Sequence, residues 1–415
     1  MRDVGALSRN TAWASLASLV QFGITAIVLA LLTYEFEPDR FGQFIAALSL
    51  IFFVAPFAGF GAPNLLHKRF GADRVQLGDA VALGRGMVLV GGPVWVTAVV
   101  LIGRVLLPDI DWVLILFLAV AELLAISYVD TMQAVVQATE TLELSVVMKL
   151  AQSGFRLVAV AVLLLLIEQP TLRDWASLYL LAAISSSLVA ELVVRRHVLA
   201  KSTVVLPTSA DAREGLGLTM GWGTERLRTD ADKVLLVRMG FGADAGLYGA
   251  ANRVLQIVYV PIRGAIAASL ARFWRGANEP GSPTKFARQL ARVATLYGIG
   301  AGVAVAGASP LLPLVLGDGY DETSSVLLWL APMPLLMALQ AFPATALTSE
   351  GMNRTRVNIV LAATVFNVVL NLWLIPESGW QGAVAATLIT EVGLTVVLWT
   401  VLLRADLGRD EKVGR

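Results

Sequence analysis

The sequence predicts an all-α integral membrane protein, and three observations support that prediction. Of its 415 residues, 57% are hydrophobic and only 15% are charged. The mean hydropathy is +0.72. The apolar residues also gather in runs of about 20, the length that crosses a bilayer as a helix. Soluble domains usually carry roughly 25% charge, so a soluble chain of this composition would expose large apolar patches and aggregate. Most of the chain is therefore expected to face lipid.

Composition also excludes several function classes. The chain has no cysteine, so it can form no disulfide framework, thiolate metal site or thiol nucleophile. Its two histidines, His67 and His197, leave little for a histidine-based metal or catalytic site. The net charge is +1 and the basic residues lie in short clusters, which argues against a nucleic-acid partner. No segment matches a nucleotide-binding P-loop. The sequence therefore gives no case for an enzyme or for a bound cofactor.

Twelve apolar runs are separated by charged or turn residues. The first run is too long for a signal peptide and has no convincing cleavage site after it, so we expect it to be retained. The loop 201–214 divides the chain into two six-helix lobes, 1–200 and 215–404, followed by a cytoplasmic tail, 405–415. The predicted spans are 10–32, 41–66, 80–102, 112–137, 145–167, 175–194, 215–237, 246–274, 290–316, 325–349, 357–375 and 380–403.

The seventh run, 215–237, is predicted from the distribution of charge rather than from hydropathy. Its six charges would cost on the order of 18 kcal/mol if they faced lipid. With the N-terminus inside, twelve spans place 22 of the 32 basic residues in cytoplasmic segments, and deleting the seventh would move eleven of these outside. We therefore expect this run to span, with its charges facing water or one another. The six charges are Glu225, Arg226, Arg228, Asp230, Asp232 and Lys233.

The two halves look weakly repeated. The tripeptide GQF opens the second run at 42–44, and GLY opens the eighth 204 residues later, at 246–248. Pro56 and Pro261 follow at nearly the same offset. Six-helix repeats are parallel and related by a pseudo-two-fold axis along the membrane normal, an arrangement that suits alternating access. Because proline and nearby glycine kink helices, Pro56 and Pro261 are predicted hinges; the alternative is that they only shape static helices.

Three stretches resemble the bacterial polysaccharide flippases of the multidrug/oligosaccharidyl-lipid/polysaccharide exporter superfamily. They are DKVLL at 232–236 with GLYGAANR at 246–253, LLPLVLGDGY at 311–320, and Asn367 and Asn371 with IPESGWQGA at 375–383. The resemblance implies translocation of an undecaprenyl-pyrophosphate-linked sugar repeat across the bacterial cytoplasmic membrane, with both termini cytoplasmic. It also implies membrane lipid, a polysaccharide polymerase and glycosyltransferases as partners.

The resemblance further implies a central cavity lined mainly by the first, second, seventh and eighth helices. A pyrophosphate there needs fixed cations, and the arginine fork suits phosphate oxygens. Helical spacing places Tyr248, Asn252, Gln256, Tyr259 and Arg263 on one polar stripe, with Arg253 pointing about 100° away. The alternative is a polar seam between helices. The predicted substrate-binding residues are Arg226, Arg228, Lys233, Asn252, Arg253, Gln256, Tyr259 and Arg263.

Four carboxylates are candidates for coupling transport to a proton or sodium gradient: Asp230, Asp232, Glu122 and Asp130. In the seventh run, the spacings Arg226–Asp230, Arg228–Asp232 and Asp230–Lys233 allow pairing along the helix. Such pairs either only neutralise the helix or hold basic groups that protonation or ion exchange releases. With Arg253 and Arg263, the seventh and eighth helices carry a formal surplus of +2, which favours an anionic substrate.

The fourth run places its polar residues Glu122, Asp130, Gln133 and Gln137 within an arc of about 80°. They form either an ion relay or, for the acids, a pairing with Arg156 of the next run. Glu191 and Glu391 have no partner that sequence alone can assign.

Two other transport functions compete with the flippase. An ion-coupled drug or organic-cation antiporter of the same superfamily would offer acid to its substrate, but residues 10–33 carry no ionisable side chain; Glu122 and Asp130 keep that alternative open. A peptidoglycan-precursor flippase resembles a fourteen-helix plan, which twelve spans do not fit.

Overall fold

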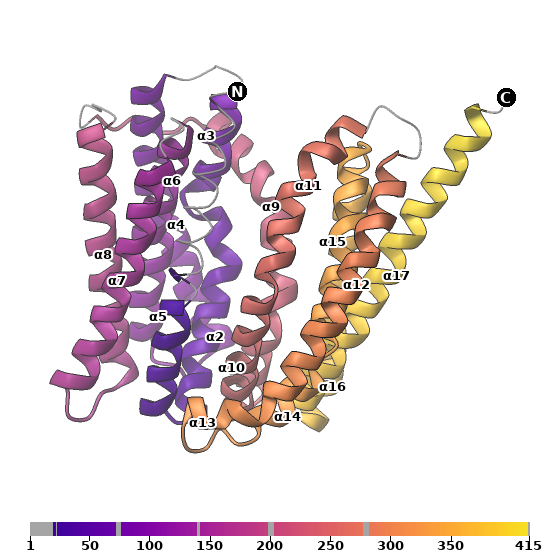
Figure 1. Ribbon diagram of the computed structural model, residues 1–415. Helices are drawn as coiled ribbons and strands as arrows, with labels where there is room; N and C mark the ends of the chain where they lie inside the picture. The colour runs from indigo at the N-terminus through magenta and orange to yellow at the C-terminus, as the bar shows by residue number, and fades with distance from the viewer. Residues whose placement is uncertain are drawn as a thin grey trace. The chain divides into compact units, whose positions relative to one another are not determined.

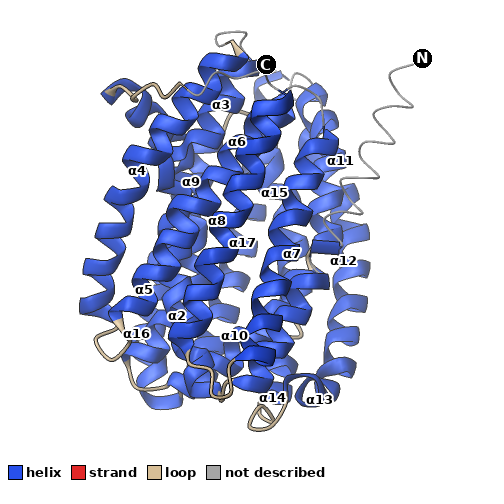
Figure 2. Cartoon of the chain, turned by 90° about the vertical axis from the view of Figure 1, so that its left-hand side faces the viewer, coloured by secondary structure: helices blue, strands red, loops and turns tan. Residues whose placement is uncertain are grey.

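The computed structural model describes residues 20–21, 23–71, 76–138, 142–197, 203–276 and 282–413. Within these ranges the chain is helical nearly throughout and contains no strand (Figure 2). The chain packs as two compact units, Met1–Arg226 and Leu227–Arg415. The predicted all-α membrane fold is therefore confirmed. The first predicted run lies partly outside the described residues, and its described part is the helix Gly23–Glu35.

The first unit is a bundle of helices, in which spans that follow one another along the chain run antiparallel (Figure 1). Its core includes Leu66, Val81, Val129 and Met132, all fully buried. In chain order its elements are α2 (Pro38–Val54), a 3-10 segment (Ala55–Gly61), α3 (Ala62–Gly71), α4 (Leu77–Leu106), α5 (Trp112–Ala119), a π-helix (Val120–Ile126), α6 (Ser127–Ala138), α7 (Leu142–Leu166), α8 (Leu172–His197) and the first half of α9 (Ser209–Arg238).

The second unit begins inside α9. Its core gathers Phe273, Phe342, Leu347 and Leu398. Its elements are the second half of α9, α10 (Gly242–Val258), α11 (Val260–Gly276), α12 (Ser282–Ala308), a 3-10 turn (Ser309–Leu311), α13 (Leu312–Leu316), α14 (Thr323–Trp329), α15 (Met333–Ser349), α16 (Asn353–Ser378) and α17 (Trp380–Val413).

Within the described ranges, eight helices are long and apolar enough to cross a membrane, and ten if each of two bent pairs counts as one span. The helix α9 is not among them, as its six charges lead one to expect. The number twelve stays a prediction. The predicted tenth span, 325–349, is divided between α14 and α15, which meet at a bend of 40° and together are apolar enough to cross a membrane. Pro332 and Pro334 lie at that bend, where proline cannot donate the hydrogen bonds of a continuous helix.

The second predicted run is interrupted where its proline lies. Pro56 opens the segment Ala55–Gly61, in which Ala58 is extended (ψ 142°) and Gly59 and Phe60 have φ of 55° and 52°. A positive φ is the left-handed region, which is costly for a residue with a Cβ such as Phe60. The helix therefore does not merely kink at this point. It makes a non-helical turn before α3 begins.

The eighth predicted run is interrupted in a milder way. Tyr259 separates α10 from α11, with ordinary right-handed angles and a bend of 41°. Pro261 is the second residue of α11, where a missing N–H costs little because the first turn of a helix has no acceptor for it. The predicted interruptions at both prolines are confirmed as breaks in the helix; whether they move stays a prediction.

The linker that precedes α9 lies along α4. The Val205 N–H donates to the Ala82 carbonyl at 3.0 Å, and the Arg85 guanidinium donates to the Thr203 carbonyl at 3.3 Å. After it, α9 starts at Ser209, inside the predicted loop 201–214, and the division between the packing units falls later, after Arg226.

Candidate functional site

Four charged residues of the second half of α9 are buried. Arg228, Asp230, Asp232 and Lys233 are 8%, 7%, 2% and 5% exposed. The Lys233 ammonium lies 3.2 Å from the Asp230 carboxylate and 3.1 Å from that of Asp232. It also faces the ring of Tyr248 on α10, 5.4 Å from its centre. The predicted Asp230–Lys233 pair is confirmed.

Arg228 forms an ion pair that helical spacing did not reveal. Its partner is Glu391 of α17, and the Gln340 side chain of α15 donates to the same carboxylate at 2.6 Å. Glu391, whose partner sequence alone could not assign, is therefore paired with Arg228. Partners within a helix can be found by counting residues, whereas partners on another helix depend on tertiary packing. Including Glu391 lowers the formal surplus around α9 and α10–α11 from +2 to +1.

Arg226 belongs to the first unit and is exposed. Its guanidinium lies 5.7 Å from the centre of the Phe52 ring on α2. A cation over an aromatic face is attracted by the ring quadrupole. Of the three basic residues predicted on this helix, Arg226 is therefore presented at the surface, while Arg228 and Lys233 lie in buried ion pairs.

The predicted polar stripe divides at the bend between α10 and α11. Tyr248 is buried and its hydroxyl meets Thr387 of α17 at 3.2 Å, so at this residue the stripe is a polar seam between helices, as the alternative has it. Arg253, expected to point away from the stripe, donates to Gln256 at 3.2 Å. Beyond the bend, the exposed Arg263 lies over the Tyr259 ring at 5.3 Å. The 41° bend changes the helix direction at Tyr259, which a constant 100° per residue cannot describe.

Asn252, also on α10, turns its side chain back to its own helix. Its amide donates to the Tyr248 carbonyl at 2.9 Å, and the residue is half-buried. Arg253, Gln256 and Tyr259 are half-buried like Asn252, and Arg263 is exposed.

In the first unit, Glu122 lies in the π-helix and is buried. It accepts hydrogen bonds from Arg156 of α7 at 3.2 Å and from the Tyr179 hydroxyl of α8. Arg156 also lies over the Tyr179 ring at 4.9 Å. The alternative that Glu122 pairs with Arg156 is confirmed.

Glu122 and Asp130 differ in exposure but lie near each other. Asp130, on α6, is exposed and Glu122 is buried, yet Asp130 interacts electrostatically with Glu122 and with Arg156. The π-helical turn Val120–Ile126 begins before Glu122 and ends before Asp130. Sequence spacing carries no sign of such a turn.

Glu191 of α8 also has partners that were missed. Its carboxylate lies 2.7 Å from Arg85 of α4 and 2.5 Å from Arg195, and it accepts a hydrogen bond from the Tyr128 hydroxyl of α6. The partner Arg195 follows Glu191 by four residues, which is the spacing of helical ion pairs and was a usable signal. The pairing with Arg85 leaves no such signal in the sequence, because Arg85 lies on another helix.

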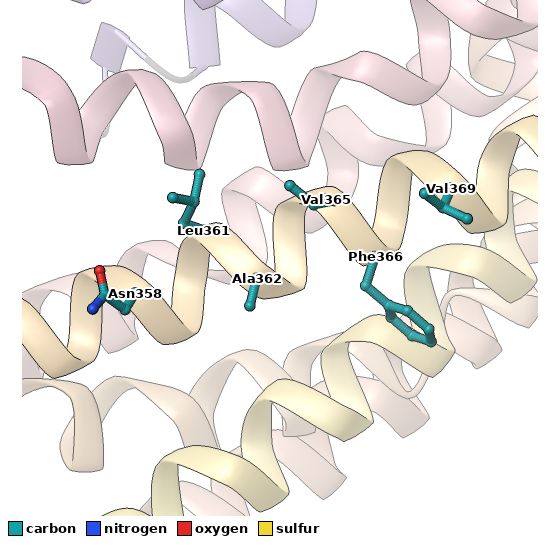
Figure 3. Close-up of a pocket in the computed structure, with 6 residues that line it drawn as sticks. All are labelled: Asn358, Leu361, Ala362, Val365, Phe366 and Val369. Carbon is teal, nitrogen blue, oxygen red and sulfur yellow. The ribbon is translucent and has the colours of Figure 1, made fainter.

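Two apolar pockets lie on α16. One, of about 580 Å³, is lined by α16 alone, and the other, of about 500 Å³, lies between α16 and α17. Figure 3 shows Leu361 and Val365 on one side of α16 and Phe366 on the side of α17. None of the predicted binding residues lines either pocket. The first is lined by Asn358, Leu361, Ala362, Val365, Phe366 and Val369.

Among the described residues, no group of three or more histidine, aspartate or glutamate side chains is placed to hold a metal ion. The arrangement offers instead two kinds of charged group. At the α10–α11 bend the exposed Arg263 lies over the Tyr259 ring and the half-buried Arg253 donates to Gln256, and buried acid–base networks join neighbouring helices in each unit.

Comparison with known proteins places this arrangement in a family. Residues 7–272 match the family model described as polysaccharide biosynthesis protein. Among curated proteins, none matches the sequence significantly.

Solved structures of low sequence identity share the fold. An inward-facing multidrug resistance MATE family transporter of the MOP superfamily superposes with a TM-score of 0.72 at 13% identity, covering 93% of this chain and 94% of that one. The lipid II flippase MurJ in an inward closed conformation gives 0.74 at 12% identity, covering 95% and 89%. A MOP superfamily transporter from Pyrococcus furiosus gives 0.66 at 12%, covering 95% and 96%.

Proposed function

Because the chain belongs to the family of polysaccharide biosynthesis proteins, we propose that it translocates an undecaprenyl-pyrophosphate-linked oligosaccharide repeat unit by alternating access. The chain is a multi-pass membrane protein with the fold of the MOP exporter superfamily. Its family and its structural neighbours are transporters, so it is assigned to transporters and not to enzymes. We place it in the bacterial cytoplasmic membrane with both termini inside. Glycosyltransferases would supply its substrate, and a polysaccharide polymerase would consume it.

The observation that carries the proposal is the exposed arginine at the α10–α11 bend. Arg263 rests on the neutral ring of Tyr259 and keeps its guanidinium exposed. Cations inside a membrane segment are expensive and are retained where they meet a polar path or an anion. A guanidinium matches two phosphate oxygens at once, which an isoprenoid pyrophosphate supplies. Arg253, held by Gln256 on the other side of the bend, provides a second such group.

Coupling to a proton or sodium gradient is part of the proposal. Glu122 with Arg156 and Tyr179 in the first unit, and Asp230 and Asp232 with Lys233 in the second, join carboxylates to cations inside membrane helices. Protonating such a carboxylate releases its cation, because the neutral acid no longer attracts it. The buried cations Arg228 and Lys233 would then bind substrate only after such a release.

The test is transport in proteoliposomes that contain a fluorescent isoprenoid-pyrophosphate oligosaccharide. We expect Arg263→Gln to lower the translocation rate by at least about tenfold, the cost of one lost charge-assisted hydrogen bond to a phosphate. The double variant Arg253→Gln/Arg263→Gln should be slower still. The charge-reversed Arg263→Glu should abolish glycan export in cells.

The matched control is Arg238→Gln, which removes an exposed arginine from the end of α9. It should translocate at the normal rate. Normal surface polysaccharide in an Arg263→Glu strain would contradict the assignment of Arg263 to the substrate path.

A second candidate is an ion-coupled antiporter of drugs or organic cations. The structural match to a multidrug resistance transporter and the exposed carboxylate of Asp130 favour it. Efflux of cationic dyes that is lost in Asp130→Asn, with unchanged glycan export, would support the antiporter. Dye resistance that is equal with and without the protein would support the flippase.

A further inference from the structure

One face of α12 changes from cationic to apolar along its length. At 100° per residue, positions 285, 288, 292, 296, 299 and 303 fall within an arc of about 80°. The first three are Lys285, Arg288 and Arg292, all exposed. The next three are exposed apolar side chains, Leu296 (74%), Ile299 (51%) and Val303 (68%). Cations therefore occupy about two turns near the N-terminal end of the helix, and the same face is apolar for about two further turns.

Within the described ranges, the side chains of this face are exposed and not packed against another helix. Only 17% of the most apolar window of the span Pro283–Leu316 is buried, the smallest share among the eight spans. The other side of α12 packs on α15, where a Cβ at Gly298 would come within 2.5 Å of the Leu335 Cα. The cationic and apolar residues thus point away from the helix that holds α12 in the unit.

The neighbouring charges leave this end of α12 positive. Asp406 of α17 lies 3.6 Å from Arg288 and partly offsets it. Glu350 reaches Thr284 at 3.4 Å, one residue before Lys285. Against these stand three cations of α12 and the exposed Arg272 of α11, which lies over the Phe286 ring at 4.1 Å. The N-terminal end of a helix also carries a partial positive charge, so Lys285 and Arg288 increase a potential that is already positive.

We propose that this face of α12 binds an anionic glycerophospholipid of the membrane. The lipid phosphate lies among Lys285, Arg288 and Arg292, and its acyl chains lie along Leu296, Ile299 and Val303. The dimensions agree, since the helix rises about 17 Å from Arg292 to Val303, close to the roughly 15 Å of hydrocarbon in one leaflet. Basic residues at the membrane surface attract anionic headgroups, and the apolar half selects a molecule that also has chains.

The experiment is native mass spectrometry of the full chain in detergent, titrated with phosphatidylglycerol or with phosphatidylcholine of the same chain length. We expect the protein to prefer phosphatidylglycerol, and Lys285→Gln/Arg292→Gln to lose at least about tenfold in affinity for it. That variant leaves the Arg288–Asp406 pair in place. Arg292→Lys should keep the preference, because a phosphate needs only a cation there.

The matched control is Arg196→Gln/Arg354→Gln, which removes two exposed cations from the ends of α8 and α16. It should bind phosphatidylglycerol as the unchanged protein does. An equal loss in this control would overturn the proposal, since total charge would then decide binding.

A second arm tests whether the site recognises a lipid or only a phosphate. Inorganic pyrophosphate should fail to displace long-chain phosphatidylglycerol at comparable concentration, and phosphatidylglycerol with six-carbon chains should bind at least about tenfold more weakly. Displacement by pyrophosphate, or equal affinity for both chain lengths, would overturn the assignment to lipid. Because binding is measured without transport, the result is independent of the proposed flippase activity.

Discussion

The two halves of α9 are held in their units by opposite means. The first half is joined to the first unit by close backbone packing: a Cβ at Gly215 would lie 2.1 Å from the carbonyl oxygen of Phe60, in the non-helical turn between α2 and α3. The second half is joined to the second unit by buried charges, with Arg228 paired to Glu391. The first half of α9 thus packs closely because Gly215 has no side chain, and the second half is held by an ion pair between charged side chains.

The difference teaches where each half tolerates change. The glycine contact is destabilised when a larger side chain adds volume, and the ion pair is destabilised when one of its charges is removed. The following substitutions test each half by its own weakness.

The largest effect is expected from Glu391→Gln. It leaves the buried Arg228 without its carboxylate and should lower the free energy of unfolding by about 3 kcal/mol or more. Denaturant-induced unfolding in mixed micelles measures this. Glu377→Gln, at an exposed glutamate near the end of α16, should have almost no effect. The double variant Arg228→Met/Glu391→Leu should recover most of the loss, because no charge then stays buried alone; a double variant as unstable as Glu391→Gln would argue that the ion pair itself is required.

Gly215→Ala should have the next largest effect. The added methyl group meets the Phe60 carbonyl and the helix must shift, so we expect a loss of about 2 kcal/mol. Gly217 lies two residues later, on the opposite face of the same helix, and nothing comes within 4 Å of its Cβ position. Gly217→Ala should instead gain roughly 0.5–1 kcal/mol from helix propensity. The same unfolding measurement should therefore give opposite signs. Equal signs would show that the first half of α9 is not held by close packing.

The two helix breaks should differ by a smaller amount. Gly59 has φ 55° and a Cβ there would come within 3.0 Å of Val88, so Gly59→Ala should cost about 1 kcal/mol. Gly264, after the α10–α11 bend, has open space around its Cβ position, and Gly264→Ala should be neutral or gain a few tenths of a kcal/mol. A comparison of the thermal unfolding midpoints of the two variants checks this. A loss at Gly264 as large as at Gly59 would mean that the second break is as constrained as the first.

The smallest effect concerns the ion pairs at the start of α9. Burial alone would raise the pKa of Asp211, but hydrogen bonds from Thr208 and Arg69 outweigh it and hold that pKa below its ordinary value of 3.8. Hydrogen bonds from Lys68 and Arg69 likewise hold the pKa of Glu214 below 4.5. A lowered carboxylate pKa adds stability above the ordinary value, and that stability is lost as pH falls through the lowered one.

The unfolding free energy should therefore keep this contribution from pH 7 to pH 5 and lose it below about pH 4. In Asp211→Asn the contribution is absent at every pH, and the loss at pH 7 should be about 0.5 kcal/mol, since the pair with Arg69 is partly exposed. Unfolding measured against pH in both proteins checks this. An equal dependence in the two would assign the acid sensitivity to other carboxylates.

The sequence predicts the apolar helices well because their signal is local. Pro56 and Pro261 mark both breaks, and Asp230–Lys233 follows from helical spacing. What it misses is tertiary or depends on irregular turns. Arg228–Glu391 and Arg85–Glu191 join residues from distant helices. The π-helical turn Val120–Ile126 also leaves no sign in the sequence spacing. Tyr248 is buried by Thr387 of α17, a contact that the composition of α10 does not reveal.

The position of α9 also decides how the polypeptide can be divided. The linker before α9 bonds to α4, yet the packing units part only after Arg226, inside α9. A polypeptide cut in the linker would therefore give a C-terminal fragment that still carries residues 209–226, a piece of the other unit. The two fragments, produced separately in one cell, should reassemble because residues 209–226 of the C-terminal fragment can pack again beside Gly61 of the N-terminal fragment. A cut made within α9 would separate the units cleanly and remove this means of reassembly.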